Sequence, residues 1–192
     1  MALTPSVAAS GIADALLGAS GLTDYMGANN VTLEEIASVW KDYPQAWADY
    51  YDEYALQGVI SGSDIPSSDP SIIHAFFTKC ANEEFGDDYA TLLIEFGQMF
   101  ADYWSTVFVS GGAPAHGGME VVSVSNDASG FQPQFTAAII AHGQANSGIY
   151  ASPPFVKFIS DIEVVVKQIT WTIDELMPTT PPAPQSFSEN IS

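Results

Sequence analysis

Positive charge is what this sequence lacks most: it has no arginine, and only four lysines stand against 23 acidic residues. The lysines, Lys41, Lys79, Lys157 and Lys167, are scattered along the chain. Affinity for nucleic acid comes largely from cations that displace counterions from phosphates, so this shortage argues against direct nucleic-acid binding. An anionic membrane surface would repel the chain for the same reason.

The acidic residues are concentrated in the first half of the chain. Residues 1–108 hold 16 of them and two lysines, whereas residues 109–192 hold seven and two. A strongly acidic surface keeps a protein soluble, and high salt screens its self-repulsion. The composition is therefore compatible with a marine or halophilic source.

Cysteine and long apolar runs are scarce as well. Cys80 is the only cysteine, which excludes an intrachain disulfide and a thiolate-rich metal site. We expect Cys80 to be a small buried residue on a helix. Residues 1–21 contain no basic residue and Asp14 interrupts their apolar run, so a signal peptide is not expected. No run approaches the length of a membrane span.

Nucleotide-binding motifs are absent too. The glycine-rich stretch 107–125, VFVSGGAPAHGGMEVVSVS, lacks the Gly-Lys-Ser/Thr of a phosphate-binding loop and has no cation nearby. It also follows an expected helix and precedes an expected strand, the reverse of the order around a dinucleotide-binding loop. We interpret the stretch as a connector between two portions of the chain.

No catalytic motif is evident. His74, His116 and His142 lie far apart in the sequence without an HExxH spacing, and no serine lies in a GxSxG elbow. We expect His74 to be partly buried on the helix that carries Phe76 and Phe77. A site built from His116, His142 and acidic residues stays open, and it defines a hydrolase as the alternative hypothesis. The sequence itself assigns no catalytic, cofactor-binding or metal-binding residue, and it implies no cofactor.

Acidic residues cluster at residues 64–69 and again at residues 83–88. Neither cluster follows the calcium-loop pattern D-x-[DN]-x-[DN]-G. Closely spaced carboxylates repel one another and favour a counterion, so a loose cation site at the second cluster is one interpretation. A solvated acidic face is the default interpretation. The second cluster comprises Glu83, Glu84, Asp87 and Asp88.

Helical periodicity dominates the first half of the chain. Residues 6–17 are compatible with a short helix, and the capping box Thr32–Glu35 predicts the start of a longer one. Pro44 lies within the apolar stripe of that longer helix, so we expect a kink or a break, with Asp42 capping a second piece. The stripe comprises Leu33, Ile36, Trp40, Tyr43, Trp47, Tyr50 and Tyr54.

Aromatic residues at this helical spacing are typical of a packed core. The alternative is an exposed platform, including Tyr51, on which carbohydrate rings stack. Asp49, Asp52 and Glu53 occupy other positions of the same helix, and we expect them to form a solvated face.

Two further helices complete the expected bundle. Asp69-Pro70 indicates the start of a short helix that runs to Cys80. Asp87 can cap a longer helix over residues 89–107, where apolar residues recur at steps of three and four. Residues 1–108 are therefore expected to form an acidic helical bundle.

The residues that follow the glycines mix both kinds of element. Residues 119–125 favour a short strand, and residues 135–141 a helix that Pro133 begins and Gly143 stops. Between residues 155 and 177 apolar residues follow a seven-residue repeat, which favours one long amphipathic helix.

A strand is the competing interpretation for the end of that segment. Ile169, Trp171 and Ile173 alternate there with threonines, which is typical of a strand. Residues 179–192 are rich in proline and are expected to form an extended tail, ordered against a partner. The predicted class is thus α+β, mostly α, with a bundle over residues 1–108, a smaller portion over residues 109–178 and the tail.

Two parts of the chain carry a resemblance to a known group of proteins. Met1-Ala2, Ala9 and the run Ile12–Leu16 precede a series of helices, and the small-residue stretch Ser110–Gly118 lies near the middle. This pattern resembles small virion structural proteins of tailed bacteriophages. The resemblance implies a repeated copy in a symmetric assembly such as a capsid, neck, tail or baseplate, and it implies no residue role.

The leading hypothesis is therefore a non-enzymatic structural protein of a virion, oligomeric and in contact with like or unlike protein subunits. A cytoplasmic location is the alternative to the virion. Besides the hydrolase, a carbohydrate- or host-surface-binding module that uses the aromatic residues of the 40–54 stretch is the other alternative function.

Overall fold

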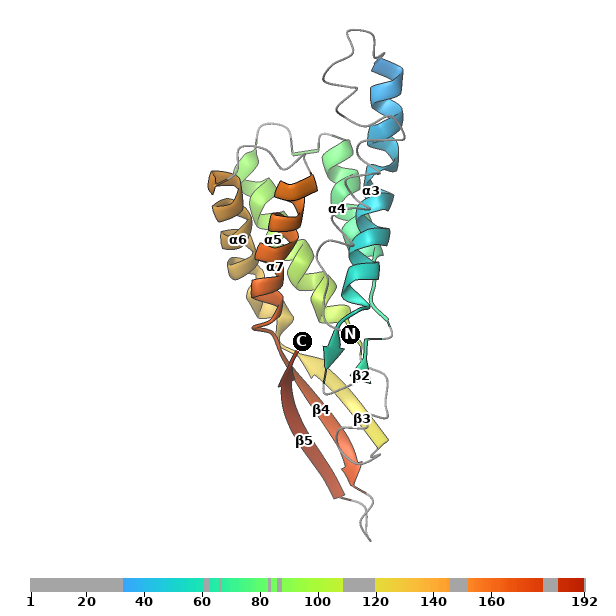
Figure 1. Ribbon diagram of the computed structural model, residues 1–192, viewed down its shortest axis with the longest axis vertical. Coiled ribbons are helices and arrows are strands. Elements are labelled where there is room, and N and C mark those ends of the chain that lie inside the picture. The colour runs from blue at the N-terminus through green and yellow to red at the C-terminus, as the bar shows by residue number, and fades with distance from the viewer. Residues whose placement is uncertain are drawn as a thin grey trace.

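The computed structural model describes residues 33–60, 63–65, 67–82, 84–85, 88–108, 120–145, 152–177 and 183–191. Within these residues the chain forms five α-helices and two small antiparallel sheets, so the expected class, α+β and mostly α, is confirmed. Figure 1 shows the helices gathered in a bundle, with the three-stranded sheet extending from one end of it. The expected helix over residues 6–17 and the glycine-rich residues 109–119 lie outside the described residues.

Helix α3 spans Leu33–Ala55, and Thr32 of the predicted capping box lies outside the described residues. Of the kink or break expected at Pro44, the break is wrong, because the helix continues through Pro44 as one element of 23 residues. An interior proline costs a helix about 3 kcal/mol. Burial of Trp47, Tyr51 and other side chains beyond the proline offsets that cost, so Asp42 caps no second helix.

An aspartate lies near the start of each of the next two helices. Helix α4 (Ser71–Ala81) has Pro70 at its N-cap position, so the expected cap, Asp69, lies one residue too early. Asp69 Oδ1 accepts a hydrogen bond from the Ser71 amide at 3.1 Å. Helix α5 (Tyr89–Thr106) is capped by Asp88, which accepts from the Thr91 amide at 3.0 Å and from the Thr91 hydroxyl at 2.8 Å. The prediction of Asp87 as the cap was wrong by one residue.

A short hairpin of β1 (Val59–Ile60) and β2 (Ser63–Asp64) lies between α3 and α4. Gly58 precedes it and lies against Ile191 at the end of the chain. A Cβ on Gly58 would be only 2.5 Å from Ile191 Cδ1. The last described residue is thus packed onto the first half of the fold.

The second half contains the expected short strand and helix. Strand β3 (Glu120–Asn126) confirms the strand predicted for residues 119–125. The 3-10 helix η2 (Ala128–Phe131) leads into helix α6 (Gln132–Ala145), which is longer than expected because Gly143 does not stop it.

The long helix expected over residues 155–177 is wrong over its second part. Helix α7 (Ser152–Val166) ends before a turn, and strand β4 (Thr170–Met177) follows. Ile169, Trp171 and Ile173 are all fully buried at every second residue. The alternation at the end of the segment, and not the seven-residue repeat, describes β4 correctly.

The proline-rich tail is extended as expected, but it is not a free arm. Strand β5 (Ala183–Asn190) pairs antiparallel with β4 along its whole length, from Thr170 opposite Asn190 to Met177 opposite Ala183. The sheet order is β3-β4-β5, and the β3–β4 register shifts between Val121 and Ser123.

One hydrophobic core joins the bundle to the upper part of this sheet. Its members come from both sides of residue 108 and include Phe100, Trp104, Ile162 and Trp171. The rings of Trp104 on α5 and Trp171 on β4 lie 6.3 Å apart in an edge-to-face arrangement. The bundle therefore supports one end of the sheet, and the other end extends past the helices in Figure 1.

Candidate functional site

His142 is the only histidine of the two-histidine hypothesis that the described residues include, and it lies between α6 and α7. Its Nδ1 is 2.9 Å from Asp161 Oδ2. A carboxylate can only accept, so Nδ1 donates the hydrogen. Asp161 Oδ1 also accepts from Lys157, one helical turn earlier. Burial raises the pKa of Asp161, but the hydrogen bonds from Lys157 and His142 outweigh it and hold this pKa below its ordinary value.

This arrangement is enclosed. His142 is 2% exposed, and its ring packs edge-on against Phe158 at 5.2 Å. A general base has to reach a substrate proton within hydrogen-bond distance, directly or through one water. In the geometry seen here the pair joins two helices and presents no imidazole to a surface. His116 lies outside the described residues, so its approach to His142 stays a prediction.

Two residues that were expected to pack inside the fold, His74 and Cys80, are less buried than predicted. His74 is exposed on α4, which corrects the expectation of partial burial. Phe76, on the same helix, is buried, whereas His74 Nδ1 lies 3.5 Å from the Thr78 hydroxyl oxygen. Cys80 is half-buried instead of buried. Burial raises the pKa of its thiol to about 11, which keeps the thiol protonated at neutral pH.

The aromatic stripe of α3 belongs to the core wherever the structure describes it. Trp47, Tyr51 and Tyr54 are buried, and Tyr50 packs partly against them. Trp47 stacks on Phe77 with ring centroids 4.3 Å apart. These rings offer no platform to a glycan, as the core interpretation predicts.

Asp52 belongs to a partly buried hydrogen-bond network that the sequence did not predict. The solvated face expected on α3 holds for Asp49 and Glu53 but is wrong for Asp52. Asp52 is partly buried and accepts from the Tyr103 hydroxyl at 2.8 Å and from Ser68. Burial, and then the Asp52 charge, raise the pKa of Tyr103 well above its ordinary value. The network ties α3 to α5 and to the segment before α4.

The described residues of the acidic cluster at 83–88 do not form a metal-binding site. Its described members, Glu84 and Asp88, are exposed, and Asp88 is engaged in capping α5. Across the described ranges, no three His, Cys, Asp or Glu residues group closely enough to hold a metal ion.

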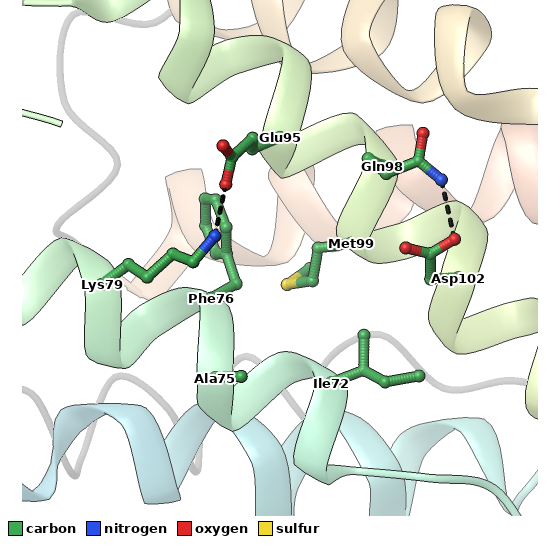
Figure 2. A pocket seen from close by; sticks show the side chains of 8 residues that line it. All are labelled: Ile72, Ala75, Phe76, Lys79, Glu95, Gln98, Met99 and Asp102. Atoms are coloured by element: carbon green, nitrogen blue, oxygen red, sulfur yellow. Dashed lines mark hydrogen bonds and ion pairs between the residues drawn. The ribbon is translucent and has the colours of Figure 1, made fainter. Parts of the chain in front are cut away.

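A groove of about 390 Å³ lies between α4 and α5, and Figure 2 shows the side chains that line it. Apolar groups from both helices face the groove. Its polar groups bind each other: Lys79 Nζ lies 2.9 Å from Glu95 Oε2, and Gln98 donates to Asp102 at 2.7 Å. No side chain here pairs a nucleophile with a base. The apolar lining comprises Ile72, Ala75, Phe76 and Met99.

The three-stranded sheet carries a polar cluster centred on its middle strand. Asp174, on the central strand, accepts from Ser123 of β3 and from Ser186 of β5, both at 2.6 Å. These two hydrogen bonds hold the pKa of Asp174 below its ordinary value. The strand alternation was the available sequence signal for this residue, because it assigns Asp174 to the face opposite Ile173.

The two edges of the sheet differ. On the β3 side the irregular register between Val121 and Ser123 interrupts the ladder. On the β5 side eight residues pair with β4 without interruption, and the side chains of Gln185, Ser186 and Ser188 are exposed. We take the β5 edge as the candidate interaction site.

Comparison with known proteins returned no match: no family model, no curated protein and no solved structure matches this chain. Among the helices that the structure describes, none is both long enough and apolar enough to cross a bilayer.

Proposed function

We propose that this chain is a non-enzymatic structural subunit whose role is to contact other protein subunits in a larger assembly. The single observation that carries the proposal is the three-stranded sheet, which extends beyond the bundle and ends in the regular edge strand β5. An edge strand presents unpaired main-chain donors and acceptors, which are a ready template for another chain.

The sequence resemblance to small virion structural proteins of tailed bacteriophages gives the assembly its proposed identity. In this proposal the chain is a repeated component of a capsid, neck, tail or baseplate. The interior positions of the described α3 aromatics and of His142 support a structural role for these residues, because both groups contribute to packing between helices.

The test is the oligomeric state of the purified chain, measured by multi-angle light scattering over a range of concentrations at low and at high salt. We expect species larger than the monomer, and more of them at high salt, because salt screens the repulsion between chains of net charge −19. A strict monomer under both conditions would contradict the proposal.

A further inference from the structure

Helix α6 lacks charge, which is unusual in so acidic a chain. Residues 128–156 contain no Asp, Glu, Lys or Arg, although these types make up 14% of the sequence, a share at which even spacing would place several in a segment of this length. Among the helices that the structure describes, α6 is the only one with no residue of these four types. Figure 1 shows α6 at the margin of the bundle, where a helix usually presents charged side chains to solvent.

The outward side of α6 is apolar as well as uncharged. Phe135 and Ile139 are buried in the core, so they occupy the inner side of the helix. A surface helix is usually apolar on one side only, whereas α6 is apolar on both, which is typical of a helix that is covered on both sides. Apart from Gln134, the side chains that the structure describes as exposed on α6 are Pro133, Ala137, Ile140 and Ala141.

Helix α5 extends this surface. Gly97 of α5 lies against Thr136 of α6, because a Cβ on Gly97 would be 2.1 Å from the Thr136 hydroxyl oxygen. Ile94 precedes Gly97 by three residues, so it lies on the same side of α5 as that contact. Ile140 follows Thr136 by four residues, so it lies on the corresponding side of α6. Ile94 is 54% exposed and Ile140 is 37% exposed, so both border the contact on its outward side.

We propose that this outward surface binds a second copy of the chain, about a two-fold axis close to Ala137. The inference rests on the proposed assembly function and names a surface by which two copies meet. The surface, which we call the α5–α6 face, comprises Ile94, Pro133, Ala137, Ile140 and Ala141.

Charge decides in favour of a second copy. Chains of net charge −19 repel one another, so two copies approach closely only where neither brings a carboxylate. The α5–α6 face meets that condition, because Glu95 and Asp102, the acidic residues of α5, line the groove against α4 instead. A basic partner protein would find no carboxylate on the α5–α6 face with which to pair, whereas an identical copy offers the same neutral surface.

The small side chains of α6 suit a close contact between two helices. Pro133, Ala137 and Ala141 recur at every fourth residue and therefore form one row along α6. A two-fold axis at Ala137 sets this residue against its counterpart, and it sets Pro133 of each copy against Ala141 of the other. Two helices with alanine at their contact can approach to the lower end of the usual interaxial range, about 8 Å. Ile94 and Ile140 lie beside this row, so the same contact removes them from solvent.

A carboxylate placed on the α5–α6 face tests the proposal in the full chain. Ala137→Glu sets two like charges against each other at the axis, and glutamate remains a good helix former at this exposed position. Ala75→Glu is the matched control, because Ala75 is exposed on α4, which has no extensive contact with α6. Multi-angle light scattering over a range of concentrations should show a dimer for the wild type and for Ala75→Glu, and an association constant lower by at least about tenfold for Ala137→Glu. Far-UV circular dichroism and urea unfolding check that both variants keep the wild-type fold.

Disulfide cross-linking tests the position of the axis. At an interaxial distance of about 8–10 Å, two Cα atoms that face each other across the contact lie about 3.5–5.5 Å apart, which overlaps the disulfide range. The two Ala141 residues would instead lie about 12 Å apart along the helices, beyond that range. With Cys80→Ser to remove the native thiol, we expect a linked dimer from Ala137→Cys under mild oxidation, and far less from Ala141→Cys.

The other outcomes each overturn a stated part of the inference. Efficient linking of Ala141→Cys with itself would overturn the axis at Ala137. If light scattering shows association but Ala137→Glu associates as well as Ala75→Glu does, the surface is wrong and the assembly function stands. A wild-type chain that stays monomeric at every salt concentration overturns both.

Discussion

At Gly97, helices α5 and α6 approach each other too closely to leave room for a side chain. The variant Gly97→Ala therefore tests this packing. A Cβ on Gly97 would lie 2.1 Å from Thr136 Oγ1, 2.8 Å from Thr136 N and 2.9 Å from Gln132 O. The Thr136 hydroxyl can rotate away. The other two atoms belong to the α6 backbone, so the helices have to separate.

The size of the effect follows from two opposing terms. Alanine is favoured over glycine in a helix interior by about 1 kcal/mol. Moving a backbone contact from 2.8 Å to an ordinary separation requires a shift of about half an ångström, and overpacking of this kind costs about 1–3 kcal/mol. The shift also disturbs the contact between Phe100 and Phe135, whose rings lie 5.7 Å apart. We therefore expect the free energy of unfolding to fall by as much as about 2 kcal/mol.

Urea unfolding followed by tryptophan fluorescence measures this difference. Gly130→Ala is the control, because a Cβ on Gly130 would meet nothing within 4 Å, and we expect its stability to match the wild type. If Gly97→Ala proves more stable than the Gly130→Ala control by about 1 kcal/mol, the close α5–α6 contact is refuted, since only the propensity gain would then remain.

Two further changes probe the buried polar contacts. Asp52→Ala removes the acceptor of the buried Tyr103 hydroxyl and should lower the free energy of unfolding by about 1–3 kcal/mol. The control Glu53→Ala, on the exposed face of the same helix, should change it little. Equal effects of the two variants would contradict the hydrogen-bond network. For Asp161 the folded pKa lies below the unfolded value of about 3.9, so its contribution is complete above that pH and is lost as the pH falls through the folded pKa. The stability difference between wild type and Asp161→Asn, measured from pH 7 to pH 2.5, should therefore shrink only below about pH 4, and a difference independent of pH would contradict the pairing.

Local signals predicted the helical elements well. The start of α4 after Asp69-Pro70, the aspartate cap of α5 and the apolar spacing of α5 all depend on neighbours within one or two turns. Such patterns are readable in a single sequence because the partners of each residue lie three or four positions away. The error at Pro44 has a tertiary cause, since burial of the residues after it sustains the helix.

The features that the sequence alone did not reveal depend on partners that lie far away along the chain. Asp52 is bonded to residues 16 and 51 positions away. The segment after Val166 satisfies a seven-residue repeat and a two-residue alternation at once, and only pairing with β3 and β5 decides between them. The prolines of the tail predicted its extended backbone. They did not predict its position beside β4, because that position depends on strand pairing.

The charge distribution links this fold to the proposed assembly. The acidic residues lie mostly before residue 108, in the part of the chain that forms α3 to α5, whereas β5 carries a single carboxylate. Two copies of so acidic a chain repel one another wherever their acidic surfaces come close, so a stable contact between copies has to lie on a part of the surface that carries little charge.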